Sequence, residues 1–151
     1  SYQISGLKYR EMKKDDPGNI RLLEKGVEIL PRVVTPENLN KGVVEVIVED
    51  DIVPLTLSDA LLGTLVEIRG ISVDEVHVTT KEESASFGAM TMTCTKDGES
   101  IQIRTLPLYE DGELLTERDF LGFVIDVTGV LDTYEGKSQI RVFSIDDITV
   151  Y

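Results

Sequence analysis

The sequence predicts a mainly β protein, in which a small five-stranded barrel with a short helix between its third and fourth strands follows an N-terminal α/β extension. Apolar and polar residues alternate in short stretches throughout the second half of the chain, which is the pattern of half-buried strands. Asp97 and Gly98 join two of these stretches, and this dipeptide favours a tight hairpin turn. Gly70 and Gly129 each stand late in an alternating stretch, where glycine lets a strand bulge and curl as a small barrel requires.

The barrel is expected to occupy residues 61–151. Its strands are predicted at residues 63–70, 90–95, 101–104, 123–131 and 139–143. Alternation makes one face of each strand apolar, and this face is expected to point inward. The predicted inward residues are Val66, Ile68, Met92, Cys94, Ile101, Ile103, Ile125, Val127, Ile140 and Val142. Residues 134–137 form the loop of a second hairpin, and residues 145–151 are an apolar extension after the last strand.

The helix between the third and fourth strands is predicted from its caps. Thr116 is a suitable N-cap, because the acidic Asp119 follows three residues later. Gly122 ends the helix after about one or two turns. The same arrangement precedes the first strand, where Thr56 and Asp59 stand before Gly63.

The N-terminal extension, residues 1–60, is predicted to contain a helix and a strand. Thr35 caps a helix that has Pro36 in its first turn. Val43–Val48 then alternates as a strand before an acidic break at residues 49–51. Because the apolar side chains of these elements need cover, we expect the extension to pack onto the barrel through the helix at residues 35–39 or through the strand.

The predicted order of strand, strand, strand, helix, strand, strand resembles the OB fold. Residues 63–70 (GTLVEIRG), 122–130 (GFVIDVTGV) and 134–140 (YEGKSQI) resemble the first, fourth and fifth strands of OB domains in bacterial extracellular nucleases and surface lipoproteins, which often occur in tandem. The resemblance covers about three fifths of the chain. It implies a module of a larger bacterial protein, outside the cell or at its surface. Residues 1–4 resemble residues 137–140, so residues 1–60 are either a linker or contain the end of a preceding OB repeat.

Charge and composition limit the partners of the chain. The net charge is −13, and residues 61–151 contain 7 Lys or Arg and 17 Asp or Glu, a net charge of −10. Phosphate-backbone binding draws most of its affinity from Lys and Arg, so this charge opposes tight nucleic-acid binding. No apolar run is long enough to span a bilayer, and no targeting segment is visible.

The sequence contains no arrangement typical of an enzyme or a metal site. His77 is the only histidine and is expected to be an outward strand residue. Cys94 is the only cysteine and is expected to be a buried apolar thiol. The acidic clusters at residues 49–51 and 146–147 lack the ligand order of a Ca²⁺ loop, so we interpret them as solvated turns. We therefore expect no catalytic residue, no metal and no cofactor.

The resemblance implies a ligand face on the second and third barrel strands, flanked by the loops after the first and fourth strands. The outward residues of that face are expected to be Thr91, Thr93, Thr95, Gln102 and Arg104. None is aromatic, whereas proteins that bind single strands stack bases on aromatic rings. The candidate ligand-binding residues are Arg69, His77, Arg104, Tyr134, Lys137 and Arg141.

Two functions fit these observations. The first is a non-catalytic scaffold or protein-interaction module, which contacts other domains of its parent chain or a protein partner. The alternative is weak binding of single-stranded nucleic acid in support of a nuclease domain elsewhere in the parent protein. The acidic charge and the lack of an aromatic platform favour the first function.

Overall fold

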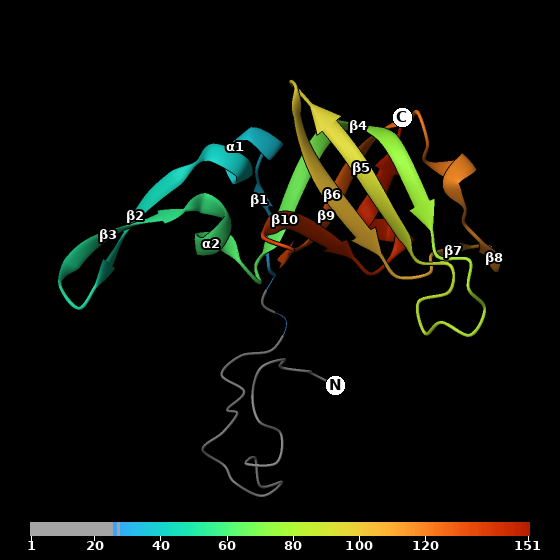
Figure 1. The fold of residues 1–151 in the computed structure, drawn as a ribbon, viewed down its shortest axis with the longest axis horizontal. Helices are drawn as coiled ribbons and strands as arrows, with labels where there is room; N and C mark the ends of the chain where they lie inside the picture. Colours follow the sequence, from blue (N-terminus) through green and yellow to red (C-terminus); the bar gives the residue numbers. More distant parts are fainter. Residues whose placement is uncertain (1–25, 27) are drawn as a thin grey trace, which may run out of the picture.

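The computed structural model describes residue 26 and residues 28–151. Figure 1 shows a β-barrel and, beside it, a two-stranded hairpin that is joined to the barrel by two short helices. The predicted strand at residues 1–4 lies outside the described residues. No helix in the described part of the chain is long and apolar enough to cross a membrane.

Five strands form the barrel. They are β4 (Leu65–Val78), β5 (Met90–Lys96), β6 (Glu99–Thr105), β9 (Val124–Tyr134) and β10 (Lys137–Val142). The strands follow each other in the order β4, β5, β6, β10 and β9, and pairing of β4 with β9 closes the ring. The β6–β10 pair is parallel and the other four pairs are antiparallel. This is the OB topology, so the fold class predicted from the sequence is confirmed.

The long strand β4 contributes to two sides of the barrel. Its first half pairs with β9 and its second half with β5, and its register with β9 shifts between Ile68 and Ile71. Gly70 lies in this bulge with a φ of 61°, a conformation that other residues rarely adopt. The N–H of Gly70 donates to the Asp126 carboxylate at 2.7 Å. The bulge predicted from Gly70 is confirmed.

Gly129 has a different structural role. Its φ is not positive, but a Cβ at this position would lie 2.5 Å from the carbonyl oxygen of Arg141 and 2.6 Å from Cγ2 of Ile140. Glycine at this position therefore lets β9 and β10 approach each other closely.

The barrel interior is apolar. All of the residues predicted to point inward are at most 4% exposed, which confirms that prediction. Phe120, in the connection between β6 and β9, belongs to the same core. Val34 and Leu39 from the N-terminal extension also belong to it, so the extension contributes to the core.

The connection from β6 to β9 contains the predicted helix as a single 3-10 turn, η2 (Glu117–Asp119), after the small hairpin of β7 (Tyr109–Glu110) and β8 (Glu113–Leu114). The Asp119 carboxylate accepts hydrogen bonds from the N–H of Thr116 at 2.6 Å and from its hydroxyl at 3.1 Å. The helix is short because Phe120 is buried in the core and Gly122 follows with a φ of 83°.

The N-terminal extension contains β1 (Arg32–Val33), α1 (Pro36–Lys41), β2 (Val43–Val48), β3 (Asp51–Thr56) and α2 (Leu57–Leu61). The Thr35 hydroxyl accepts a hydrogen bond from the N–H of Asn38 at 3.1 Å, so the predicted helix cap is confirmed. The Thr56 hydroxyl caps α2 in the same way, accepting from Asp59 at 3.0 Å. α1 packs on the barrel through Leu39, as one of the two expected alternatives requires.

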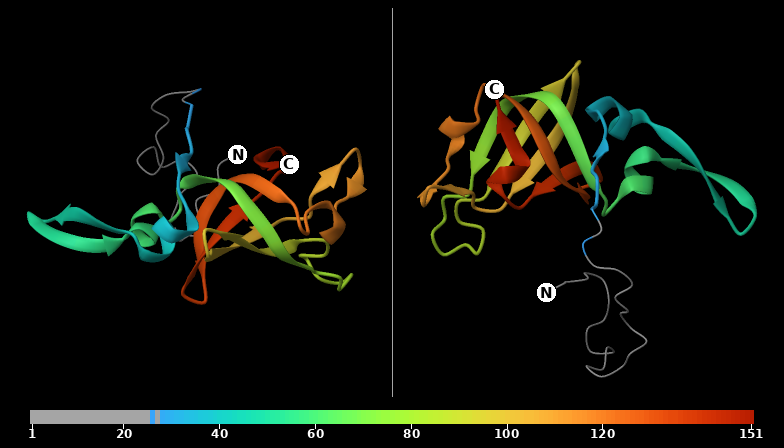
Figure 2. Two further views of the ribbon diagram at one scale, coloured as in Figure 1. Left: turned by 90° about the horizontal axis from the view of Figure 1, so that it is seen from above. Right: turned by 180° about the vertical axis from the view of Figure 1, so that it is seen from behind.

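The hairpin of β2 and β3, residues 43–56, is called the arm. Figures 1 and 2 show the arm projecting away from the barrel. The second alternative, packing of Val43–Val48 on the barrel, is therefore wrong. The N–H of Leu57 donates to the carbonyl of Gly42 at 2.8 Å. The N–H of Gly42 donates to the carbonyl of Asn38, also at 2.8 Å. These bonds fix the base of the arm to α1 and α2, which lie between the arm and the barrel.

The C-terminal residues form η3 (Ile145–Asp147) and β11 (Ile148–Val150). β11 pairs antiparallel with β9, with Ile148 opposite Val127. The sequence predicted an apolar extension at this place but not this strand. The hydroxyl of Tyr151 donates to the Asp126 carboxylate at 2.9 Å, which ties the end of β11 to the barrel.

Candidate ligand-binding face and pocket

One row of side chains crosses four strands on the outside of the barrel. His77 on β4 is the register partner of Thr91 on β5, Thr91 is the partner of Arg104 on β6, and Arg104 is the partner of Arg141 on β10. Register partners share a face of a sheet, and the alternating apolar neighbours of these residues point into the core. The structure therefore brings His77, Arg104 and Arg141 together.

The two arginines of this row are held by different partners. Nη1 of Arg104 donates to Oγ1 of Thr91 at 2.7 Å. Nη1 of Arg141 lies 3.7 Å from Oδ2 of Asp132, and its guanidinium carbon lies 5.8 Å from the ring centre of Phe143. The row thus combines two guanidinium groups with one aromatic ring, and a neighbouring carboxylate offsets part of the positive charge.

A small cavity of about 90 Å³ adjoins both arginines. Residues 85–86 of the loop after β4 and Phe143 contribute to its walls. One water needs about 10–15 Å³ of such space, so the cavity can hold several waters or a small anion.

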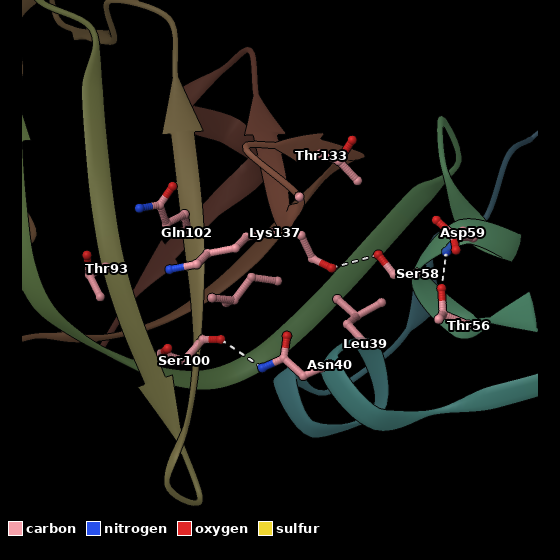
Figure 3. Close-up of a pocket in the computed structure, with 13 residues that line it drawn as sticks. Leu39, Asn40, Thr56, Ser58, Asp59, Thr93, Ser100, Gln102, Thr133 and Lys137 are labelled. Atoms are coloured by element: carbon pink, nitrogen blue, oxygen red, sulfur yellow. Dashed lines mark hydrogen bonds between the residues drawn. The ribbon is translucent and has the colours of Figure 1, made fainter.

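A larger pocket of about 580 Å³ lies between the helices α1 and α2 and the outer face of β5, β6 and the β9–β10 turn, as Figure 3 shows. Lys137, one of the predicted site residues, lines it. The other lining residues are Leu39, Asn40, Thr56, Ser58, Asp59, Thr93, Ser100, Ile101, Gln102, Thr133, Gly136 and Ser138.

Contacts between the extension and the barrel hold this pocket in shape. Nδ2 of Asn40 donates to the carbonyl of Ser100 at 3.1 Å and to the Glu99 carboxylate at 3.1 Å. Lys41 forms an ion pair with Glu99. The hydroxyls of Ser58 and Ser138 are hydrogen-bonded at 2.6 Å. Hydrogen bonds from Lys41 and then Asn40 lower the pKa of Glu99, and the bond to Glu99 raises the pKa of Lys41.

The chemistry of the larger pocket is that of hydrogen bonding. Hydroxyl and amide groups dominate its lining, with Lys137 as the one cation and Asp59 as the one anion among the lining residues. Its volume is within the range of small-molecule sites, about 300–1,000 Å³, although such sites usually have a more apolar lining. The arrangement can bind polar groups, and Lys137 can bind an anion.

The structure separates the remaining candidate residues. Tyr134 is the register partner of Lys137 at the end of the β9–β10 hairpin, and it is 58% exposed. Arg69 forms an ion pair with Glu67 at 2.7 Å, which raises the pKa of Arg69. Asp126 and Tyr151 are the other groups that raise the pKa of Arg69, and they are hydrogen-bonded to each other at the β9–β11 side of the barrel. Arg69 is therefore not part of the row of His77, Arg104 and Arg141.

Sequence reasoning missed several residues of the site, among them Phe143, Asn40 and Ser58. Phe143 stands two residues after the exposed Arg141, so the period-two pattern could have assigned it to this face. Asn40 and Ser58 had no such signal. They meet barrel residues 60 and 80 positions later in the chain, and no local pattern reports contacts of that length.

The other residues singled out from the sequence are buried in the core or lie in turns. Cys94 is fully buried, as predicted, and burial raises the pKa of its thiol to about 12. Glu49 and Asp50 form the exposed turn of the arm, with φ of 49° and 72°. Asp146 lies in η3, where the Ser144 hydroxyl accepts from its N–H at 3.2 Å. Among the described residues, no group of three or more His, Cys, Asp or Glu side chains could hold a metal ion.

No protein-family model and no curated protein matches the sequence. Among solved structures, the chain is similar to a chain in the structure of a replication protein A heterotrimer bound to ssDNA. The two are 14% identical, the match covers 74% of this chain and 75% of that one, and the TM-score is 0.42.

Proposed function

We propose that this chain is a non-catalytic interaction module of a larger protein, in which the barrel is the scaffold and the arm docks onto a protein partner. One observation carries the proposal: the arm presents large apolar side chains to solvent. Ile47, Ile52 and Val43 are 77%, 67% and 65% exposed. Ile47 and Ile52 are register partners and lie side by side on one face of the hairpin.

Two physical arguments connect this exposed face with a partner. An isolated two-stranded hairpin is only marginally stable in water, because it has too little apolar surface to bury. Contiguous apolar surface on a folded protein marks an interaction site more often than chance. Covering Ile47 and Ile52 would contribute about 1.5–3 kcal/mol for each side chain. A bound arm is therefore more stable than a free one.

The two side chains best suited to catalysis support a non-catalytic role. Cys94 is buried, and a thiol with a pKa of about 12 keeps its proton at neutral pH. His77 lies on the exposed surface of β4, where its register partner is Thr91. As part of the same proposal, the resemblance of residues 63–70 and 122–130 to OB domains of bacterial surface proteins favours a parent protein at the cell surface or outside the cell.

Site-specific crosslinking in the cells that produce the protein tests this function. A photo-crosslinking amino acid at Ile47 is expected to capture one defined partner, which is then identified and purified. The double variant Ile47→Ser, Ile52→Ser is expected to weaken binding of that partner at least about tenfold, because two apolar contacts are lost. Isothermal titration calorimetry measures the affinity.

Leu121→Ser is the matched control, because Leu121 is also an exposed apolar residue but lies outside the arm, in the turn between η2 and β9. It is expected to leave the affinity unchanged. Equal binding of the arm variant and the control would show that the arm is not the docking element.

Weak binding of single-stranded nucleic acid is a second candidate function. Arg104 and Arg141 of the row, with Phe143 beside Arg141, favour it, because guanidinium groups bind phosphate and an aromatic ring can stack on a base. The net charge of −10 on residues 61–151 and the carboxylate of Asp132 beside Arg141 act against it. The expected affinity is therefore no tighter than about 10⁻⁴ to 10⁻⁶ M at physiological salt.

Fluorescence anisotropy with a labelled oligonucleotide at two salt concentrations tests the second function. Arg104→Ala and Arg141→Ala are expected to weaken the binding, whereas Arg69→Ala, which removes an arginine outside the row, is expected to leave it nearly unchanged. Sub-micromolar, salt-sensitive binding that Arg104→Ala abolishes would make nucleic acid, and not a protein, the main ligand.

A further inference from the structure

The edges of the barrel are partly covered by short strands, whereas no other strand among residues 28–151 pairs with the arm. β1 pairs with β4 at Val66 and Glu67, and β11 pairs with β9 at residues 125–127. β1 lies along a stretch of β4 that does not pair with β5, and β11 lies along a stretch of β9 that does not pair with β10. In the part of the chain that the structure describes, β2 and β3 pair only with each other. Each strand of the arm therefore presents one free edge to solvent.

The register of the arm determines which backbone groups point outward. In a hairpin with a two-residue turn, the pair next to the turn is hydrogen-bonded, and bonded and non-bonded pairs then alternate. Val48 and Asp51 are the pair next to the turn. Counting along both strands from this pair, Gly42 and Leu57 also fall on a hydrogen-bonded position, and the N–H of Leu57 does donate to the carbonyl of Gly42 at 2.8 Å. The intervening non-bonded positions on β2 are those of Val43, Glu45 and Ile47. Their N–H and C=O groups point away from β3.

The two edges of the arm are not equivalent. Pro54 occupies the middle outward position of β3, opposite Glu45 in the register. Proline has no N–H, so it interrupts the donor row of an edge strand and prevents further pairing there. β2 has no proline and offers three consecutive outward donors. The β2 edge is therefore the one that can pair with another strand.

Charge indicates the chemistry of that strand. The arm contains Glu45, Glu49, Asp50 and Asp51 and no Lys or Arg, on a chain with a net charge of −13. A second copy of the chain would bring the same carboxylates together, and like charges on paired strands are destabilising. A strand flanked by Lys or Arg would instead be attracted to the arm.

We propose that the β2 edge accepts an extended segment of a protein partner as an added β-strand, and that this segment alternates apolar residues and is flanked by basic ones. The proposal rests on the interaction function proposed above and names its binding mode. Main-chain hydrogen bonds to Val43, Glu45 and Ile47 provide the pairing, and the carboxylates of the arm select the basic flanks.

Hydrogen exchange on the wild-type chain tests the pairing directly. The probe is a synthetic peptide of alternating valine and threonine with two lysines at each end, and the control is the same peptide with glutamates in place of the lysines. The lysine peptide is expected to slow exchange of the Val43, Glu45 and Ile47 amides and to leave those of Ile52 and Thr56 unchanged. The glutamate peptide is expected to bind about tenfold more weakly or worse, because it is repelled by the arm.

Two variants at one position separate the backbone contribution from the charge. Glu45→Pro removes the central outward N–H and is compatible with the hairpin, because it mirrors Pro54 on the opposite strand. Glu45→Gln removes the same charge but keeps the N–H. Glu45→Pro is expected to bind the lysine peptide about tenfold more weakly than Glu45→Gln, because the added strand loses a hydrogen bond and meets the proline ring. The exchange of the Val44 and Val46 amides reports whether the hairpin remains intact.

Three results would overturn the strand-addition proposal. These are equal peptide binding by the two variants, protection of Ile52 and Thr56 instead of the β2 amides, and a neutral-pH dimer of the wild type that Glu45→Pro dissociates. The last result would assign the β2 edge to a second copy.

The interaction function is tested separately, and it fails if the double variant Ile47→Ser, Ile52→Ser leaves the affinity of the crosslinked partner unchanged. A partner that is sensitive to that double variant but not to Glu45→Pro would sit on the apolar face of the arm.

Discussion

Cys94 illustrates how the barrel interior suppresses the chemistry of a side chain. Burial first, and then the charge of Asp74, raises the pKa of the Cys94 thiol from 9.0 to about 12. We expect the native protein to react with a thiol reagent such as Ellman's reagent only as fast as it unfolds. Rapid labelling without denaturant would contradict the closed barrel.

The unfolded chain can ionise this thiol and the folded chain cannot, so the free energy of unfolding is expected to fall as the pH rises from about 9 to about 12.

Gly129 and Gly98 allow the effect of close packing to be separated from that of backbone conformation. Gly129→Ala would place a Cβ against the backbone of Arg141, so we expect a loss near the upper end of about 1–3 kcal/mol in the free energy of unfolding. Gly98→Ala has open space but a φ of 82°, and its expected cost is about 1 kcal/mol. Urea unfolding measures both. A larger loss for Gly98→Ala would contradict the close approach of β9 and β10.

At the scale of residues, the alternation of apolar and polar side chains predicted the inward positions of the barrel, because every second residue of a strand points to the same side. The Asp97–Gly98 turn was predictable for a similar reason, since both residues have positive φ and few residue types tolerate it. The distinct role of Gly129 was not predictable, because the distance between β9 and β10 depends on side chains of both strands.

At the scale of elements, the docking of α1 is expected to depend on pH through Glu99. Hydrogen bonds from Lys41 and Asn40 lower the pKa of Glu99. A carboxyl group of this kind adds stability above its unfolded pKa of about 4.3, and this stability is lost as the pH falls through the lower folded value. We therefore expect the α1 amides to lose protection from hydrogen exchange below about pH 4.

Glu99→Gln should remove most of this pH dependence, and Glu83→Gln, at an exposed loop position, should leave it unchanged. An equal pH dependence in the wild type and in Glu99→Gln would show that another carboxylate controls the docking.

The sequence predicted the helix α1 and the strand β2 but not which of them contacts the barrel. Thr35 and Pro36 are local signals for a helix start, and each acts within one turn. Apolar alternation in Val43–Val48 indicates a strand with an apolar face, but it does not indicate whether that face packs on the same chain or on another protein. The larger pocket could not be predicted for the same reason, since Asn40 and Ser58 reach it through contacts with the distant residues Ser100 and Ser138.

At the scale of the whole molecule, net charge is expected to keep copies of the chain apart in spite of the open arm. The charge of −13 at neutral pH disappears near the isoelectric point of about 4.4. Proteins without net charge associate more readily, and open strand edges are where they pair. We expect sedimentation velocity to show monomers at pH 7 and larger species near pH 4.4.

Glu45→Pro is expected to reduce this acid association, because it closes the β2 edge. Association of Glu45→Pro to the same extent would show that another surface mediates the contact.

The pairing that closes the barrel also has a consequence for the order of folding. Strands β5 and β6 meet across a two-residue turn, as do β9 and β10, and hairpins of this kind form in about 1–10 μs. Leu65 must find Val130 across more than sixty intervening residues, and such non-local pairing is what makes barrels fold in about milliseconds to seconds. We therefore expect the hairpins to form first and the β4–β9 seam to set the folding rate. Until the seam closes, the apolar faces of the hairpins remain in water, and this interval is when a newly made chain depends most on its acidic charge to stay apart from its neighbours.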